Sequence, residues 1–455
     1  MRSCMICRIR RGAVAALVCM LDCAVSAVAL PDEECDVVVV GAGTAGVAAA
    51  LQSARSGAKT IVVEQGFQVG GTMTSGGVNF PGLFHAWGRQ VIDGVGYALV
   101  TNCVALSGGR LPDFGKPTGP AHWRHQISIN VPLYVALAEE SLLKYGVRIH
   151  YHAAPVEAVF SGGAWRLSVV AVGDTRTIRA RQVVDCTGDA SVAAMAGFAR
   201  ERAAERQPGS FVYTLDPGVD ISRLDRTLLK RAFAEALADG RLNAYDARHG
   251  ILGLLECRGG TANYIDDADC STADLRTETN LRGRASMLRM YRFLRSVPGL
   301  EKASIVSMSP EVGVRETYRI RGEYTITQDD YTTGRVFPDS LCYAFYPVDL
   351  HDKKSGVRPA HLAEGVVATV PLRALVPRGA RNFLVAGRCV SSDRGANSGL
   401  RVEAACMAMG QVAGTAAALA ARRGASPLDL PIGELREALA SSGAVVPSSQ
   451  AAETR

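Results

Sequence analysis

A glycine-rich loop between a buried strand and a helix constrains the fold of this chain more than any other feature. The run Cys35–Val40 is short, apolar and β-branched, as in a strand buried on both faces of a parallel sheet. The sequence Gly-Ala-Gly-Thr-Ala-Gly follows at once, then a helix of small residues at 47–56 and a second apolar strand at 59–64. This order predicts a Rossmann-like βαβ unit that binds an adenine dinucleotide.

Each residue of this loop has a predicted role toward a pyrophosphate. Gly41 permits a tight turn out of the strand, Gly43 lets the backbone approach the phosphates, and Gly46 lets helix and strand pack closely. Thr44 and Ala45 lie between the last two glycines, just before the helix, whose free N–H groups would face the phosphate charge. A glycine match alone is a weak signal, but this one follows a strand and opens a helix, which argues against an ordinary glycine turn.

An acidic residue at the end of the second strand strengthens this prediction. Glu64 can accept hydrogen bonds from both ribose hydroxyls, and its charge would repel a 2′-phosphate. A second glycine pair follows shortly after, where many FAD enzymes carry one near the pyrophosphate. We expect three residues there to contact the cofactor: Gly70, Gly71 and Thr72.

Two later segments favour FAD over NAD. Val183–Asp189 is similar to the apolar strand ending in Ala-Thr-Gly of FAD enzymes with two dinucleotide-binding domains, although Cys186 stands where alanine is usual. Near the C-terminus, a strand at 382–386 precedes a helix expected over Leu400–Arg422. The positive N-terminal end of that helix would face the pyrimidine of a flavin and stabilise its anionic reduced form. The cofactor ligands predicted from these segments are Thr187, Gly188, Asp189, Gly387, Arg388 and Gly410.

The first 29 residues have the features of a secretory signal peptide. Arg8, Arg10 and Arg11 precede an apolar run at 13–21 that is too short to span a bilayer, and the segment ends in Ala-Val-Ala. We therefore expect a periplasmic or extracellular protein, with the twin-arginine route as one option for its export and an uncleaved anchor or a misplaced start as alternatives. This segment accounts for half of the net charge of +6, and nothing in the remainder resembles a nucleic-acid-binding tail.

The cysteines outside this leader argue against a metal site. Eight remain, no Cys-x-x-Cys pair occurs among them, and no histidine joins a cysteine at zinc-ligand spacing, so we expect no metal. Cys257 and Cys270 flank a polar loop and could be bridged in an exported protein or stay reduced; the sequence leaves this open.

The sequence pattern predicts an α/β protein with a discontinuous FAD-binding domain. Its parts are residues 30–200 and 371–425, interrupted by an α+β substrate domain at 201–370 with mixed helices and more charge. Residues 426–455 are expected to form a C-terminal helix and a disordered tail. We expect no membrane span in the mature chain and no nucleic acid among its partners.

Over residues 35–422 the chain resembles the FAD-dependent oxidoreductase family that is related to fumarate reductase and succinate dehydrogenase flavoproteins. The most specific stretches are residues 70–88, 313–327 and 370–389, besides the C-terminal helix. The resemblance implies the FAD-binding fold far more firmly than it implies a reaction.

Two departures from the related flavoproteins bear on the cofactor. Succinate dehydrogenase-type flavoproteins attach FAD through a histidine shortly before a glycine pair, and Gly70 stands near that position here. This implies non-covalent FAD, unless His85 takes over. Many FAD enzymes also have an acidic residue after the last strand's glycine to bind the ribityl chain. Arg388 occupies that position, so the contact is either missing or made by another residue such as Asp189 or Glu403.

Candidate catalytic residues lie in the loops and in the last helix. His85 or His125 could take a proton from a substrate hydroxyl while hydride leaves to the flavin, although a structural role is the alternative for each. Arg319 belongs to an arginine cluster around Glu316 that either binds a carboxylate or hydroxyl-rich substrate or forms an ion-paired face. Arg401, at the start of the last helix, is expected near the flavin or the substrate.

These residues predict hydride transfer between a small polar substrate and non-covalent FAD. No second glycine fingerprint precedes a helix to seat a nicotinamide dinucleotide, so a quinone or a redox protein is expected as a separate electron acceptor. The alternatives are a flavin-dependent isomerase, a double-bond reductase, or an exported FAD-containing subunit without its own catalysis. The substrate, the direction of the reaction and the oligomeric state are left open by the sequence.

Overall fold

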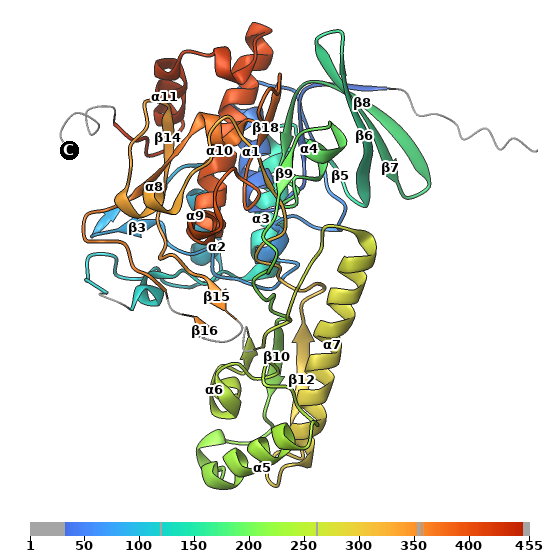
Figure 1. Ribbon diagram of the computed structural model, residues 1–455, viewed down its shortest axis with the longest axis vertical. Helices are drawn as coiled ribbons and strands as arrows, with labels where there is room; N and C mark the ends of the chain where they lie inside the picture. Colours follow the sequence, from blue (N-terminus) through green and yellow to red (C-terminus); the bar gives the residue numbers. More distant parts are fainter. Residues whose placement is uncertain (1–31, 119–120, 261–262, 353–355, 358, 449–455) are drawn as a thin grey trace, which may run out of the picture.

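The computed structural model describes residues 32–448 except 119–120, 261–262, 353–355 and 358 (Figure 1). The predicted signal peptide lies outside the described residues, as do residues 449–455 of the expected tail. The remainder forms an α/β domain with a second, elongated lobe that projects from one side (Figure 1).

A seven-stranded sheet forms the centre of the larger domain. Five strands are parallel to their neighbours, and β1 lies between β2 and β8 because its β-branched residues are buried on both faces. These strands are β1 (Glu33–Val40), β2 (Thr60–Val63), β5 (Arg148–His150), β8 (Asp174–Asp185) and β18 (Phe383–Val385). The α/β fold predicted from the sequence is therefore confirmed.

An antiparallel extension continues the sheet beyond its parallel part. Strands β6 (Ala153–Ser161) and β7 (Ala164–Ala171) form a hairpin, and β7 pairs with the first half of β8. Gly162 and Gly163 make the turn with φ of 60° and 80°, a conformation that favours glycine.

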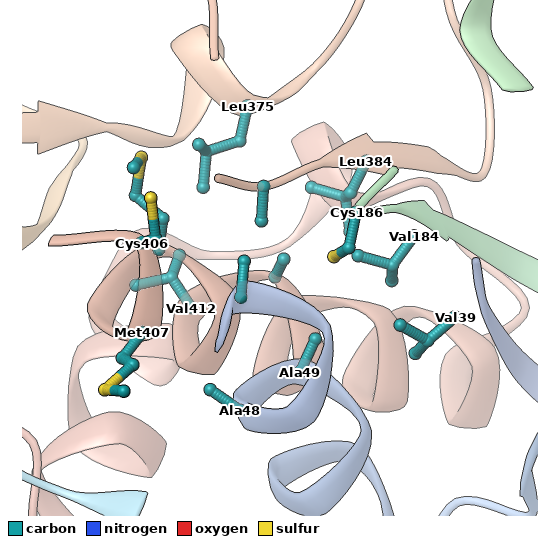
Figure 2. Packing of buried hydrophobic residues seen from close by; sticks show 14 of the residues in the cluster. Val39, Ala48, Ala49, Val184, Cys186, Leu375, Leu384, Cys406, Met407 and Val412 are labelled. Atoms are coloured by element: carbon teal, nitrogen blue, oxygen red, sulfur yellow. The ribbon is translucent and has the colours of Figure 1, made fainter. Parts of the chain in front are cut away.

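Helices α1 (Thr44–Arg55) and α10 (Glu403–Arg423) pack side by side against this sheet (Figures 1 and 2). A Cβ atom on Gly410 would lie 2.2 Å from the backbone oxygen of Ala45, so glycine is required for the two helices to approach. Gly410 therefore serves helix packing and does not line the cofactor cavity, which corrects its predicted role as a cofactor ligand. Among the described helices, α10 alone is long and apolar enough to cross a membrane, and its apolar stretch is completely buried here in the core.

The C-terminal helical segment differs from the single helix expected over Leu400–Arg422. Helix α9 (Arg394–Leu400) ends at Arg401, and α10 begins after Val402, whose backbone is extended. The break puts Arg401 and Val402 at the wall of a cavity instead of inside a continuous helix.

The remaining elements of the larger domain surround this core. They include α2 (Val95–Leu106), α3 (Val131–Lys144), α4 (Ser191–Met195), α8 (Gln328–Thr333), α11 (Ile432–Ser441), β14 (Ser340–Ala344) and β17 (Ala368–Pro371). Short strands complete it: β3 (His85–Ala86), β4 (Arg89–Gln90), β9 (Arg200–Glu201), β13 (Arg319–Ile320), β15 (His351–Asp352) and β16 (Gly356–Val357).

The projecting lobe has a hydrophobic core of its own. It contains β10 (Tyr213–Asp216), β11 (Gly259–Gly260), β12 (Ser304–Met308), α5 (Arg226–Ala238), α6 (Gly250–Glu256) and the long α7 (Ala273–Ser296). Its core residues run from Phe211 to Val314, whereas the buried residues of 320–376 pack into the larger core. The inserted domain therefore ends near Val314 and not at residue 370, because β14 and β17 pack on the larger domain.

Candidate active site

A cavity of about 1120 Å³ lies between the sheet and the projecting lobe. The carboxyl ends of four parallel strands open into it: Val40 of β1, Val63 of β2, Cys186 after β8 and Ala386 after β18. Ligands of open α/β sheets bind at this edge. The volume exceeds that of most small-molecule sites, which leaves room for a dinucleotide and a second molecule.

The glycine loop after β1 has the shape that a diphosphate requires. Gly41 has a φ of +91°, and a Cβ there would lie 2.5 Å from the oxygen of Cys186. A Cβ on Gly46 would lie 1.8 Å from the oxygen of Gly41, so Gly46 is a packing residue under the loop. A Cβ on Gly43 would meet no atom within 4 Å, because that position opens into the cavity. The cradle fits a pyrophosphate beside Thr44 and Ala45, which also line the cavity.

The carboxylate of Glu64 contacts this loop at Ala42 and also lines the cavity. Its two oxygens accept hydrogen bonds from the backbone N–H groups of Ala42 and Gly66, both at 2.6 Å. Burial raises the pKa of Glu64, and these two hydrogen bonds oppose that shift. Each oxygen keeps further acceptor capacity toward the cavity, which suits the ribose contact predicted for this residue.

The second glycine pair supports the first. Gly71 and Thr72 line the cavity, as predicted for cofactor ligands. Gly70, with a φ of +99°, donates its N–H to the oxygen of Ala42 at 2.7 Å and supports the loop from behind. It thus shapes the cradle without lining it.

The loops after β8 and β18 meet in an ion pair. The residues predicted there as cofactor ligands all line the cavity: Thr187, Gly188, Asp189, Gly387 and Arg388. Arg388 donates to Asp189 at 2.8 Å and to the backbone oxygen of Gly188 at 2.9 Å. Although burial opposes ionisation, the Arg388 guanidinium lowers the pKa of Asp189. The acidic residue that sequence reasoning sought for the ribityl chain is thus already paired.

The start of α10 faces the cavity. The N-cap residue Val402 and the first helical residue Glu403 line it, so the positive end of the helix dipole points into this space. Burial raises the pKa of Glu403 to about 7, even though Arg401, Arg315 and Arg388 favour its ionised form. A carboxyl group with such a pKa can exchange a proton near neutral pH.

Three arginines gather where the larger domain meets the projecting lobe. The side chains of Arg248, Arg315 and Arg401 line the same end of the cavity. Arg315 donates to the oxygen of Pro208 and, at 3.3 Å, to Ser210. Arg401 donates to the backbone oxygen of Asp349 at 3.2 Å, but its Nε atom is buried without a partner. Burial lowers the pKa of Arg315 to about 10, with a further lowering by Arg401.

A histidine is fixed beside these arginines by two hydrogen bonds. His351 Nε2 lies 2.9 Å from Asp349 Oδ2, and His351 Nδ1 lies 2.6 Å from the hydroxyl of Tyr264. Burial lowers the pKa of His351 to about 3, so the ring is neutral at physiological pH. Because the carboxylate can only accept, Nε2 carries the proton and the tyrosine donates to Nδ1. Arg248 and Arg315 make cation–π contacts with Tyr264, and their guanidinium carbons lie 4.6 and 5.5 Å from its ring centroid.

Sequence reasoning missed this group. Its members come from segments that lie far apart in the chain, but one local signal was available. The run Tyr346–His351 follows the apolar strand β14 and places an acid two residues before a histidine, so that both can act from one loop.

The structure places three of the four predicted catalytic residues outside the lining of the cavity. His85 stacks on Phe114 with ring centroids 3.7 Å apart, and His125 contacts the edge of the same ring at 5.6 Å. Arg319 donates to the backbone oxygen of Ser392 at 2.9 Å and supports the loop before α9. Only Arg401 reaches the cavity, so His85, His125 and Arg319 contact other protein groups here.

The cysteines show no bridge within the part of the chain that the structure describes. All eight there are free, including Cys257 and Cys270, for which the sequence left a disulfide open. Cys270 instead contacts Asp189 and Arg388 through its sulfur, at 3.6 and 3.3 Å. No group of three or more His, Cys, Asp or Glu residues in the described ranges could hold a metal ion.

The chain matches the family model described as FAD dependent oxidoreductase over residues 36–439. No curated protein matches it. Solved structures with some similarity include a geranylgeranyl bacteriochlorophyll reductase-like protein from Thermoplasma acidophilum, 13% identical with 90% of this chain and 84% of that chain covered and a TM-score of 0.42.

Two further structures share less with the chain. AlpK is 13% identical, with 85% and 62% of the two chains covered and a TM-score of 0.40. A flavoprotein/dehydrogenase from Cytophaga hutchinsonii is 18% identical, with 41% and 47% covered and a TM-score of 0.28. These scores are too low to bear on function, whereas the family model spans nearly the whole described chain. The protein belongs to the FAD dependent oxidoreductase family, and it is an oxidoreductase with FAD as its cofactor.

Proposed function

We propose that this oxidoreductase transfers hydride between non-covalent FAD and a small polar substrate that carries a carboxylate. The observation that carries this proposal is the group of three arginines at one end of the cavity. A buried guanidinium without a full set of partners favours an anion nearby, and a planar guanidinium fork matches a carboxylate. Asp349 and Glu403 are the acidic side chains beside them, and the pKa of Glu403 near 7 leaves it partly uncharged.

The residues around this end of the cavity have different roles in the proposed reaction. When bound, FAD accepts or supplies the hydride. Arg315 and Arg401 hold the substrate carboxylate and orient the carbon that exchanges hydride. Asp349, fixed through His351, keeps the Arg401 side chain at the wall. Glu403 takes the proton that a substrate hydroxyl loses as its carbon gives up hydride, and it returns the proton in the reverse direction.

The proposal that FAD is not covalently attached is supported by the position of His85. That side chain packs on Phe114 and does not line the cavity, so it offers no attachment point there. Acid precipitation of the purified protein should leave all of the yellow flavin in the supernatant. Flavin that stays with the pellet would contradict this part of the proposal.

The electron acceptor and the cellular location rest on the sequence alone. We propose a quinone or a redox protein as the acceptor, and export to the periplasm or beyond if the leader is cleaved. Three further predictions also rest on the sequence alone. One is the relation to fumarate reductase and succinate dehydrogenase flavoproteins, and the other two are the alternative activities of a double-bond reductase and a flavin-dependent isomerase. An isomerase would convert its substrate with no net change in the flavin spectrum after turnover, which separates it from the proposed dehydrogenase.

An anaerobic spectroscopic screen tests the proposed substrate class. Small hydroxycarboxylates should bleach the oxidised flavin band, whereas the matched polyols and methyl esters without a carboxylate should not. Arg315→Gln should remove the bleaching, and Arg315→Lys should restore only part of it because an ammonium lacks the planar fork. Arg321→Gln is the matched control, because Arg321 is exposed and pairs with Glu201 away from the cavity. The flavin of this variant should be bleached as in the wild type. Equal bleaching by esters and acids would refute a carboxylate site.

A further inference from the structure

Arg276, which comes from the projecting lobe, lines a different part of the cavity from the three arginines described above. Arg276 lies in the second turn of α7, and its guanidinium contacts both domains. Within the lobe it meets the carboxylate of Glu311 at 3.2 Å and the backbone oxygen of Cys270 at 3.3 Å.

On the larger domain, Arg276 contacts the loops after two strands. The Gln65 amide, with its oxygen turned toward the guanidinium, accepts at 2.7 and 3.2 Å, and Asp189 Oδ2 lies 4.0 Å away. Gln65 follows β2, and Asp189 follows β8. These two strands flank β1 in the sheet, so the guanidinium lies across the carboxyl end of β1.

The glycine loop leaves the sheet at this same point. Gly43 and Thr44 line the cavity with Arg276, and the open Cβ position of Gly43 marks the space for a diphosphate. The loop itself is Gly-Ala-Gly-Thr-Ala-Gly and carries no cation, so it offers the phosphates only backbone N–H groups and a hydroxyl. A positive side chain from elsewhere would add to the attraction that the helix N-terminus exerts on a diphosphate buried against this loop.

The arginines that line the described part of the cavity leave one suitable candidate. Arg248, Arg315 and Arg401 belong to the other end, near Asp349 and His351. Arg388 is already held by Asp189 and by the oxygen of Gly188. Arg276 pairs closely with Glu311, which is more than a third exposed, and its second carboxylate, Asp189 at 4.0 Å, is already held by Arg388; the Arg276 side chain is itself 25% exposed. It can therefore turn part of its donor set toward an incoming phosphate.

We propose that Arg276 binds the diphosphate of FAD and that the cofactor thereby ties the projecting lobe to the nucleotide-binding domain. This inference rests on the cofactor and not on the proposed substrate. It predicts that the lobe is held more firmly when FAD is bound, because one side chain then joins the ligand, the lobe and the loops after β2 and β8.

Titrations of the full-length apoprotein with FAD, ADP and adenosine test this assignment without any measurement of activity. Arg276→Gln should raise the Kd for FAD and for ADP by about 10- to 100-fold, as expected for a lost charge-assisted hydrogen bond. The Kd for adenosine, which lacks the diphosphate, should stay the same within about two-fold, since two-fold corresponds to a small free-energy change. For FAD and ADP, the Kd of Arg276→Lys should lie between those of the wild type and Arg276→Gln.

Arg282→Gln is the matched control, because Arg282 lies on the same helix but pairs with Glu278 outside the cavity. It should bind all three ligands as the wild type does. Hydrogen exchange of residues 211–314 adds a second measure: FAD should slow exchange there in the wild type and much less in Arg276→Gln.

Two results would overturn the proposal. One is an equal loss of affinity for adenosine and ADP, which would make Arg276 a structural link between the domains. The other is an unchanged Kd for FAD and ADP. If circular dichroism shows that apo Arg276→Gln does not fold, the ratio of ADP to adenosine affinities in Arg276→Lys decides: a wild-type ratio refutes the proposal. A chain that binds FAD as expected but reacts with no carboxylate would leave this inference standing and refute only the proposed substrate.

Discussion

Replacing Gly43 with alanine should separate cofactor binding from folding. The added methyl group would meet no protein atom within 4 Å, and the backbone of Gly43, with φ −63° and ψ −176°, is open to alanine. Loss of chain freedom in the unfolded state stabilises such a variant by about 0.4–1 kcal/mol. Alanine is a poorer N-cap than glycine, which costs about 1 kcal/mol. The two effects nearly cancel, so the apoprotein should keep its stability.

The same methyl group should disrupt FAD binding because it points into the cavity. It would occupy the space through which the backbone N–H groups of the loop approach a phosphate oxygen. Loss of a single hydrogen bond to a charged oxygen is worth about 1.5–3 kcal/mol, which raises the Kd for FAD by about 10- to 150-fold. Steric displacement of the diphosphate would add to this lower bound.

Gly410→Ala serves as the control, because it should reduce the stability of the apoprotein, whereas Gly43→Ala should reduce FAD binding. Its methyl group would lie 2.2 Å from the backbone oxygen of Ala45, and neither α1 nor α10 can yield easily in the core. Overpacking of this kind costs about 1–3 kcal/mol. Thermal unfolding of the two apoproteins and fluorescence titration with FAD should therefore show two distinct defects. The reasoning fails if Gly43→Ala unfolds as readily as Gly410→Ala, or if it binds FAD with the wild-type Kd.

Three further variants test other parts of the site. Glu64→Ala should weaken FAD binding about ten-fold or more, and it should also destabilise the apoprotein by about 1–3 kcal/mol because two backbone N–H groups lose their acceptor; an unchanged Kd would remove Glu64 from the ribose. Arg401→Ala should make the flavin midpoint potential more negative by about 20–60 mV, because the reduced flavin loses a nearby positive charge; equal midpoints in spectroelectrochemical titration would show a purely structural arginine. Folding raises the pKa of Glu403 from its ordinary value of 4.5 to about 7, so between these pH values the folded apoprotein binds more protons than the unfolded chain. The stability of the apoprotein should therefore fall as the pH rises through that range. Glu403→Gln should flatten this dependence in urea unfolding measured at pH 5 and pH 8, and an equally steep fall would assign it to another group.

The sequence by itself determined the cofactor-binding half of this protein. The strand Cys35–Val40, the glycine loop and Glu64 are neighbours in the chain, and the periods of strand and helix place them together in space. Gly41 and Gly46 make the close backbone contacts that their spacing predicts, and Gly43 opens into the cavity, because these positions depend on the geometry of one βαβ unit. The hairpin at Gly162 and Gly163 is equally local, and it too was predictable.

Tertiary structure alone decided which polar side chains face the substrate end of the cavity. His351 acquires its hydrogen bonds from Tyr264 and Asp349, and the chain distance between Tyr264 and His351 is 87 residues. Conversely, His85 and His125 were expected in catalytic loops, yet both pack on Phe114 instead. The direction of a loop side chain depends on which remote segment packs beside it, and no local period encodes that choice.

The same reason explains the other differences between expectation and structure. Gly410 looked like a ligand because it follows the last FAD-binding loop, but the approach of α1, more than 350 residues earlier in the chain, makes it a packing residue. Arg388 stands where an acid was expected, and only the meeting of two distant loops shows that Asp189 neutralises it. Local sequence determines which backbone shape a segment can adopt, whereas the pairing of buried charges and the lining of a cavity depend on contacts between segments that only the complete fold brings together.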